Sequence, residues 1–343
     1  MNIDTQKLTA TVAQLLTPEK GILAADESNG TADKRLESFG IATGEDMRRK
    51  FRHLFLCMPG LNDFLSGVIL YDETFWQDNC DAVAFRTALT EQGILPGIKV
   101  DTGAKDFPGF PGEKLTVGLD DLPERIKKYA DAGAAFAKWR AVIKIDEAAG
   151  LPTDACIEAN ADTLARYAVI AQQFGLVPIV EPEVLLEGPH SLKTSEIVTT
   201  RVVGAVMQKL QDYKAYLPGV ILKTSMVING NKNADEASPA EVADATVRML
   251  RKTVPTEIGG VVFLSGGQTA VEATAHLDAI AEKDDLPWEI AFSYARALQE
   301  SALTIWQGKD ENVEPARAEF TKRLRLNQLA DAGDYDVSLE YLD

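Results

Sequence analysis

The chain has 343 residues, of which 45% are hydrophobic and 25% are charged. This composition is typical of soluble globular proteins and excludes the disordered and fibrous classes. The formal net charge of −17 argues against nucleic-acid binding, because such a surface repels a phosphate backbone. An anionic substrate would therefore need lysine and arginine side chains gathered locally at its site.

The N-terminal and cysteine patterns predict a cytoplasmic protein with no membrane partner. Residues 1–6 are polar, and no later stretch has the roughly 18 uninterrupted apolar residues of a membrane span. Cys57, Cys80 and Cys156 are widely spaced and form no CxxC pair. We interpret them as packing or surface thiols, not as catalytic residues.

Eight short, apolar, β-rich runs recur along the chain. Most are hydrophobic throughout, as strands covered on both faces must be, and helix-length segments separate them. This alternation indicates right-handed βαβ units and a parallel sheet. The runs cover residues 21–26, 67–71, 97–101, 136–143, 177–183, 220–226, 260–265 and 288–294.

Several of the intervening helices have readable ends. Ser238 and Glu241 form a capping box around a proline, which predicts a helix from there to about Lys252. Residues 269–272 repeat the capping pattern, and glycines at 40 and 175 stand where earlier helices should end.

Eight such units without a linker favour an α/β protein built as a (β/α)₈ TIM barrel over an open, doubly wound sheet. Barrels of about 250 residues or more fold as one domain. We therefore expect a single barrel domain over residues 1–330, followed by a flexible, acidic C-terminal tail over residues 331–343. The Pro/Gly-rich segment at 106–113 is expected to be a surface loop after the third strand.

Charged residues interrupt the apolar runs near their C-terminal ends, which form the active face of a barrel. Residues at i and i+2 of a strand point the same way, so the paired charges should share one polar pocket. Structural ion pairs bracing the interior are the alternative, but several buried ammonium groups favour a functional site. The residues are Asp26, Lys99, Asp101, Lys138, Arg140, Glu181, Glu183 and Lys223.

Lys223 lies deep in an apolar run, where burial and a second ammonium such as Lys138 would favour a neutral amine. A neutral lysine attacks carbonyl carbons. The resulting iminium withdraws electrons, so a carbon–carbon bond two atoms away can break without a metal ion. Nearby carboxylates would carry out the proton transfers.

Phosphate should bind after the seventh and eighth strands, the usual phosphate position of barrels. A Ser-Gly-Gly turn opening a helix offers free backbone N–H groups, although such a turn alone is a weak signal. Arg296 adds a guanidinium that can bind phosphate with two hydrogen bonds. The candidates are Ser265, Gly266, Gly267, Ser293 and Arg296.

From about residue 20 to residue 328 the chain resembles class I fructose-1,6-bisphosphate aldolases of the animal and plant type. The resemblance rests on the segments GILAADES (21–28), GIKVD (97–101), FAKWR (136–140), VPIVEPE (177–183) and FLSGGQ (263–268). It implies reversible cleavage of fructose 1,6-bisphosphate to dihydroxyacetone phosphate and glyceraldehyde 3-phosphate, in glycolysis and gluconeogenesis. It also implies a homotetramer that uses no metal and no cofactor.

The resemblance also assigns roles to residues. It implies Lys223 as the Schiff-base lysine, Glu181 as the main acid/base, and Asp26, Lys138 and Glu183 as partners in proton transfer and positioning. One phosphate would bind the serine, glycine and arginine residues after strands seven and eight. The other would bind Ser28, Thr31, Lys99 and Arg140, with Lys34 and Arg35 lining the substrate entrance.

The chain departs from the family's usual pattern at several positions. Thr224 and Ser225 follow the key lysine where the family has proline and asparagine, and Ala295 replaces a phosphate-facing glycine. The family's C-terminal tyrosine is not the last residue here, and Tyr341 is the candidate substitute.

Of three alternatives, the first is disfavoured by the sequence and the other two remain open. A zinc-dependent class II aldolase would need clustered histidines, whereas His53, His190 and His276 are scattered. An aldolase acting mainly on sedoheptulose 1,7-bisphosphate or fructose 1-phosphate would use the same chemistry. A non-catalytic, aldolase-like scaffold is the alternative from another class, motivated by the altered residues beside Lys223.

Overall fold

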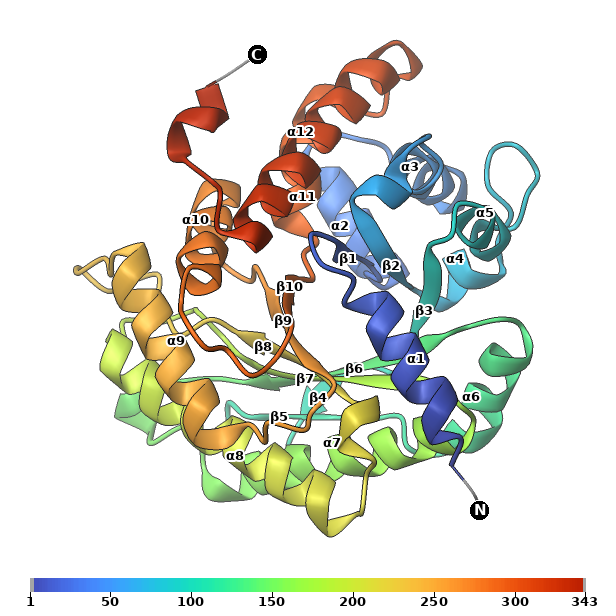
Figure 1. The fold of residues 1–343 in the computed structure, drawn as a ribbon. Coiled ribbons are helices and arrows are strands. Elements are labelled where there is room, and N and C mark those ends of the chain that lie inside the picture. Colours follow the sequence, from blue (N-terminus) through green and yellow to red (C-terminus); the bar gives the residue numbers. More distant parts are fainter. Residues whose placement is uncertain (1–2, 342–343) are drawn as a thin grey trace.

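The computed structural model describes residues 3–341 and confirms the predicted α/β barrel as a single domain (Figure 1). Eight parallel strands follow one another around the sheet in the order β1-β2-β3-β6-β7-β8-β9-β10. The backbone N–H of Ala24 donates to the carbonyl of Tyr294 at 2.9 Å, so the first strand meets the end of the last. The predicted strand ends therefore lie at one rim of a barrel.

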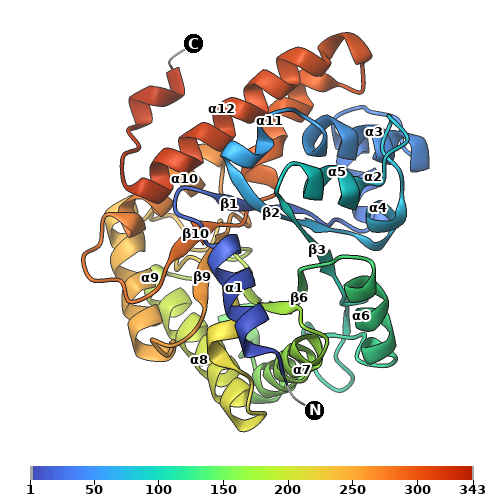
Figure 2. The same ribbon diagram turned by 45° about the vertical axis from the view of Figure 1, so that its right-hand side comes forward.

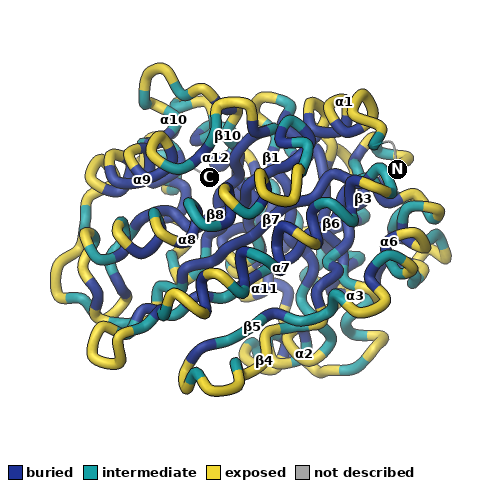
Figure 3. The backbone as a smooth tube through the Cα atoms, turned by 90° about the horizontal axis from the view of Figure 1, so that it is seen from below, coloured by how far each residue is buried: buried dark blue, intermediate teal, exposed yellow. Residues whose placement is uncertain are grey.

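The observed strands match the predicted runs to within two residues at each end. A strand that is buried on both faces is hydrophobic along its whole length, so an apolar run in the sequence marks its position. Figure 3 shows this burial along the barrel wall. The strands are β1 (Gly21–Ala25), β2 (Leu65–Leu70), β3 (Leu95–Lys99), β6 (Phe136–Ile143), β7 (Val177–Val184), β8 (Ile221–Ser225), β9 (Gly260–Leu264) and β10 (Ile290–Phe292).

Twelve described helices surround or cap the barrel (Figure 2). The capping boxes predicted at Ser238 and Thr269 are both present, and Gly40 and Gly175 take positive φ just past two helix ends, as predicted. The helices are α1 (Thr5–Leu15), α2 (Asn29–Ser38), α3 (Glu45–Leu56), α4 (Asp72–Trp76), α5 (Phe85–Glu91), α6 (Leu122–Asp131), α7 (Asp154–Gln173), α8 (Leu192–Asp212), α9 (Pro239–Thr253), α10 (Ala270–Ala281), α11 (Arg296–Trp306) and α12 (Val313–Ala332).

Two elements lie outside the eight repeating units. Helix α1 packs Leu8, Val12 and Leu15 into a core cluster with barrel residues such as Phe136, and it covers the end of the barrel opposite the charged strand ends. The Pro/Gly-rich segment at 106–113 lies between β4 (Ala104–Asp106) and β5 (Lys114–Thr116), which pair as an antiparallel hairpin.

The end of the chain packs on α12. Glu340 receives hydrogen bonds from buried Arg323 at 2.6 and 2.5 Å, and the hydroxyl of Tyr335 donates to Glu340 at 2.9 Å. The tail expected at 331–343 extends two residues beyond the described part of the chain. Within residues 3–341, none of the helices has the length and apolar character that crossing a membrane requires.

Candidate active site

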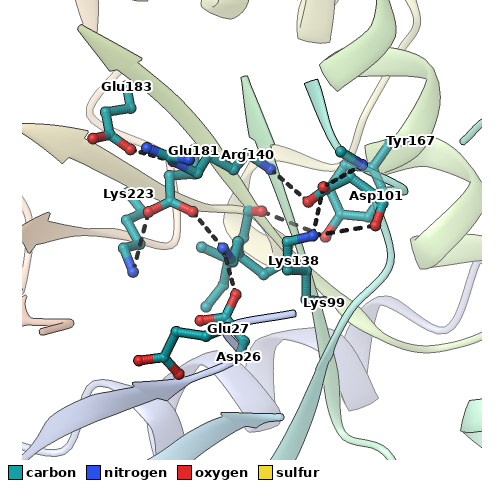
Figure 4. A network of polar contacts seen from close by, with 12 residues as sticks. Asp26, Glu27, Lys99, Asp101, Lys138, Arg140, Tyr167, Glu181, Glu183 and Lys223 are labelled. Carbon is teal, nitrogen blue, oxygen red and sulfur yellow. Dashed lines mark hydrogen bonds and ion pairs between the residues drawn. The ribbon is translucent and has the colours of Figure 1, made fainter. Parts of the chain in front are cut away.

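The charged strand ends converge on a cavity of about 660 Å³. The residues come from strands far apart in sequence, and the barrel brings their C-terminal ends together. Figure 4 shows the charged part of this cluster. Of the predicted site residues, those lining the cavity are Asp26, Ser28, Thr31, Lys99, Asp101, Lys138, Arg140, Glu181, Glu183, Lys223, Ser265, Gly266, Ser293 and Arg296.

Lys138 lies at the centre of the cluster, between two carboxylates. Its Nζ is 2.7 Å from Asp26 Oδ2 and 2.7 Å from Glu181 Oε2, and all three side chains are buried. Burial alone would lower the pKa of Lys138, but the two carboxylates outweigh it and raise that pKa. Lys138 is therefore a fixed cation.

The pKa values of the two carboxylates, Asp26 and Glu181, shift in the opposite direction to the pKa of Lys138. Burial alone would raise the pKa of Asp26, but Lys138 and Lys223 lower it to about 2. The same competition between burial and nearby cations lowers the pKa of Glu181. Both groups are therefore ionised at neutral pH and can accept protons or hydrogen bonds.

Lys223 lies on β8, on the other side of Glu181 from Lys138. Its Nζ is 3.2 Å from Glu181 Oε1, and the side chain is 3% exposed. Glu181 is the one carboxylate within ion-pair distance of this amine among residues 3–341. A buried amine touching a single carboxylate is the arrangement expected of a nucleophile with its acid/base partner.

The loops after β9 and β10 offer an anion site. Ser293 Oγ is buried without a hydrogen-bond partner, and Arg296 is exposed with no carboxylate within ion-pair distance in the described chain. Gly266 lies so close to Glu183 that a Cβ there would come within 2.9 Å of its carboxylate oxygen. An unpartnered hydroxyl and an unpartnered guanidinium together suit a phosphate group.

A second set of polar groups lies across the cavity. Lys99 Nζ is 2.7 Å from Asp101 Oδ1, and Arg140 pairs with Glu183. Burial would lower the pKa of Arg140, but Glu183 outweighs it and raises that pKa. Ser28 and Thr31 share a hydrogen bond of 3.0 Å at the start of α2.

Three of the predicted binding residues lie outside this lining. Lys34 is exposed, and Gly267 lines a different cavity. Arg35 turns inward and pairs with Glu27 at 2.5 Å and Gln299 at 2.7 Å, while its Nε and Nη2 have no hydrogen-bond partner.

The residues that depart from the family pattern take ordinary conformations. Thr224 and Ser225 are buried, and Ser225 Oγ donates to the carbonyl of Val184 at 3.0 Å. Ala295 lines the cavity with φ −114°, so its methyl group adds no backbone strain. Tyr341 is 84% exposed and is not part of the cavity lining.

Several lining residues were not predicted from the sequence. Glu27 follows Asp26 directly and forms ion pairs with Arg35 and Arg52. Its position next to a strand end was the sequence feature that could have identified it as a site residue. Other lining residues lie on or beside helices, where an isolated polar residue resembles any solvent-facing one. They are Tyr71, Asp72, Arg125 and Tyr129.

The fold and the site together define a TIM-barrel enzyme with a buried lysine and carboxylates facing an anion-binding rim. The family described as "Fructose-bisphosphate aldolase class-I" matches residues 7–341. The chain belongs to this family, which confirms the resemblance read from the sequence.

Individual relatives agree with the family match. A fructose-bisphosphate aldolase of Dictyostelium discoideum is 48% identical over 96% of this chain and 92% of its own. Arabidopsis thaliana "fructose-bisphosphate aldolase 4, cytosolic" is 47% identical over 97% of this chain and 84% of its own. Among solved structures, Plasmodium falciparum fructose-bisphosphate aldolase, in complex with TRAP and a small-molecule inhibitor, superposes with TM-score 0.95 and 46% identity over 96% of this chain and 95% of its own.

Proposed function

We propose that this class I fructose-bisphosphate aldolase, a lyase, cleaves its substrate through a Schiff base on Lys223. The observation that carries the proposal is the buried pair of Lys223 Nζ and Glu181 Oε1, 3.2 Å apart, beside the fixed cation Lys138. The pair supplies a nucleophile together with a group that can exchange its protons.

The first step is attack by the Lys223 amine on the C2 carbonyl carbon of open-chain fructose 1,6-bisphosphate. Glu181 relays protons so that the C2 oxygen leaves as water and the iminium forms. Lys138 holds Asp26 and Glu181 at 2.7 Å each, which keeps these carboxylates ionised and oriented during the step.

Cleavage follows when a carboxylate, which we assign to Glu181, takes the proton from the C4 hydroxyl. The C3–C4 bond breaks, its electrons move to the iminium nitrogen, and glyceraldehyde 3-phosphate leaves as the aldehyde. The remaining enamine is protonated at C3, and hydrolysis releases dihydroxyacetone phosphate. Glu183 lies within reach of the site and positions Arg140.

The two phosphates are assigned to the two polar sets described above. One binds Ser265, Gly266, Ser293 and Arg296, with Gly267 contributing from the same turn, because the Ser293 hydroxyl and the Arg296 guanidinium have no protein partner in the described chain. The other binds near Lys99, Arg140, Ser28 and Thr31. Lys34 and Arg35 would reach the substrate only by turning toward the cavity, since Arg35 now pairs with Glu27.

We further propose a cytoplasmic homo-oligomer, a tetramer as in the family, with a C-terminal tail after residue 330 that becomes flexible when the ion pair between Arg323 and Glu340 opens. The Arabidopsis relative cited above carries the word "cytosolic" in its name. Sedoheptulose 1,7-bisphosphate or fructose 1-phosphate as main substrate is the competing assignment, and turnover ratios on the three sugars decide it. A scaffold without turnover would release no glyceraldehyde 3-phosphate in a coupled assay.

Borohydride trapping tests the covalent step. Intact-protein mass spectrometry, after reduction in the presence of dihydroxyacetone phosphate, should show a mass gain for the wild type and none for Lys223→Met. The matched control is Lys252→Met, because Lys252 is an exposed lysine in the last turn of α9, outside the cavity lining. A full adduct on Lys223→Met would refute the assignment of the nucleophile.

Chelation tests the alternative of a metal-stabilised enolate. No cluster of three or more histidine, cysteine, aspartate or glutamate side chains suited to a metal ion occurs within residues 3–341. We expect EDTA to leave the cleavage rate unchanged, because the iminium replaces the metal as the electron sink. A rate that falls on chelation and returns with added Zn²⁺ would overturn the Schiff-base mechanism.

A further inference from the structure

A second cavity, of about 690 Å³, lies behind the loop assigned to phosphate. Ser265 and Gly266 line the catalytic cavity, whereas Gly267 and Gln268 of the same loop line the second one. The other walls come from the loop between β8 and α9 and from the first turns of α9 and α10. Apart from Gly267, which is assigned to the phosphate, no lining residue of this cavity takes part in the proposed cleavage.

The second cavity differs in charge from the catalytic one. Four carboxylates line it, those of Asp235, Glu236, Glu241 and Glu272, and no lysine or arginine is among its lining residues. Asp235 and Glu236 have no cation within ion-pair distance in the described chain, and both are exposed at the rim. Uncompensated carboxylates around a hollow attract a positively charged group.

Glu241 and Glu272 each use only one of their two carboxylate oxygens in hydrogen bonds with the protein. Glu241 Oε2 accepts from the backbone N–H of Ser238 at 2.9 Å, and Glu272 Oε2 accepts from that of Thr269 at 2.7 Å. The second carboxylate oxygen of each residue makes no hydrogen bond with any described residue. Both capping boxes therefore leave an anionic acceptor free.

His276 supplies an independent sign of a ligand. The residue lines the cavity and is only 8% exposed, and its Nδ1 lies 2.6 Å from Gln268 Oε1. Because an amide oxygen only accepts, Nδ1 carries the proton and Nε2 is the acceptor. Nε2 makes no hydrogen bond with any described residue, so this largely buried side chain leaves an accessible acceptor for a donor in the cavity. Burial lowers the pKa of His276 to about 4, which keeps the imidazole neutral.

Apolar side chains complete the lining. Leu186, Val242 and Val271 form part of the wall between the polar groups. Such surfaces suit a methylene chain, whose burial is favourable in proportion to its apolar area. The combination therefore describes a ligand with an apolar stem and a cationic, hydrogen-donating end.

We propose that the second cavity binds an ammonium group carried on a methylene chain. The ammonium donates to His276 Nε2 and lies among the four carboxylates, while the chain packs on Leu186 and Val271. A free linear polyamine and a lysine side chain of a peptide share this chemistry. The two sources are separated by the choice of probe.

Isothermal titration calorimetry on the full-length protein tests the proposal. The probes are spermidine and 1,5-diaminopentane for a free amine, Nα-acetyl-lysine amide for a peptide lysine, and 1,5-pentanediol as the uncharged control. We expect saturable binding of at least one ammonium probe and none of the diol. A diol that binds as tightly as the diamine, or the absence of binding by all ammonium probes, would overturn the proposal.

Matched variants separate this cavity from general attraction to an acidic protein. Asp235→Asn combined with Glu236→Gln should weaken ammonium binding about tenfold, as expected for the loss of two charge pairs. Asp284→Asn combined with Asp285→Asn removes the same charge from exposed positions beyond the far end of α10, and should change affinity less than twofold. Equal losses in the two double variants would refute a specific site.

His276→Leu tests the imidazole acceptor. We expect a loss of affinity of about fivefold to tenfold, because one charge-assisted hydrogen bond is removed. Circular dichroism establishes whether this variant folds, and the Asp235/Glu236 variant carries the test if it does not. Unchanged binding by a folded His276→Leu would show that the imidazole is not part of the site.

Discussion

Two aspartates at opposite ends of β1, buried Asp26 and half-buried Asp331, differ in the pKa of their carboxyl groups. Asp26 follows the C-terminal end of the strand and contacts Lys138, and the pKa of its carboxyl is lowered to about 2. Asp331, from α12, lies at the other end and accepts from the backbone N–H of Glu19 at 3.2 Å. Burial and the neighbouring carboxylates of Glu289 and Glu19 raise the pKa of Asp331 to about 7.

The difference lies in the partners and not in burial, since burial opposes ionisation in both cases. At the active end, cations compensate every central carboxylate, and the charges persist. At the opposite end, no cation is within ion-pair distance of Asp331 among the described residues, and its Oδ1 has no hydrogen-bond partner. The carboxylates at the active end therefore stay ionised at neutral pH, whereas ionisation of Asp331 at the opposite end is unfavourable.

The largest effect should come from removing the cation that sustains the active end. Lys138→Met leaves Asp26 and Glu181 buried without their shared partner, which should lower the free energy of unfolding by about 3–5 kcal/mol and abolish cleavage. Urea unfolding and the coupled aldolase assay measure the two effects. Lys252→Met is the control, because Lys252 is exposed in the last turn of α9 and lies outside the cavity lining.

The same variant changes the pH dependence of stability. In the wild type the pKa of Asp26 is lowered, so its contribution is complete above the unfolded value near 3.8 and is lost as pH falls through about 2. Without Lys138 the pKa of Asp26 should rise above the unfolded value near 3.8, because burial then dominates, so protonation relieves the buried charge and the variant should regain stability relative to the wild type as pH falls. Parallel unfolding curves for the two proteins between pH 6 and 3 would contradict the role given to Lys138.

Much of the active end could be predicted from sequence because charges in otherwise apolar strands are conspicuous. Lys138, Glu181 and Lys223 stand in runs that are buried on both faces, and the barrel order brings them together. Arg35 and Gln299 lie on different helices and are 264 residues apart in the sequence, so no local sequence pattern predicts their hydrogen bond. The same holds for Asp331, whose environment depends on how α12 meets the first and last strands.

Glu181→Gln should have the next largest effect, because it removes the proposed proton carrier while preserving the shape of the side chain. We expect the turnover number to fall by about 10²- to 10⁴-fold, the usual range for a general acid or base, with a smaller change in KM. Steady-state kinetics on fructose 1,6-bisphosphate measures both. Borohydride trapping should still label Lys223, but slowly.

Glu183→Gln is the matched control, since Glu183 points the same way from β7 but pairs with Arg140 and not with Lys223. Its effect should fall mainly on KM if it positions a phosphate-binding arginine. A Glu181→Gln enzyme with wild-type turnover would remove Glu181 from the proton transfers.

The smallest effect, and the sharpest test of the comparison, concerns Asp331. A pKa raised to about 7 means that the folded state holds a proton that the unfolded chain releases near 3.8. Stability is therefore highest below the unfolded value, falls as pH rises, and stops falling above about 7. Asp331→Asn resembles the protonated form and keeps an oxygen for the N–H of Glu19.

The substitution should leave Tm unchanged near pH 4 and raise it by about 2–4 °C at pH 8. Each pKa unit corresponds to about 1.4 kcal/mol, so the shift sets an upper limit of roughly 4 kcal/mol, which residual solvation of this carboxyl reduces. Asp284→Asn, at an exposed position, should give no such pH-dependent gain. If Asp331→Asn instead lowers Tm at pH 8, a partner must stabilise the charged carboxylate of Asp331. The two ends of the barrel would then not differ in how well they stabilise an ionised aspartate.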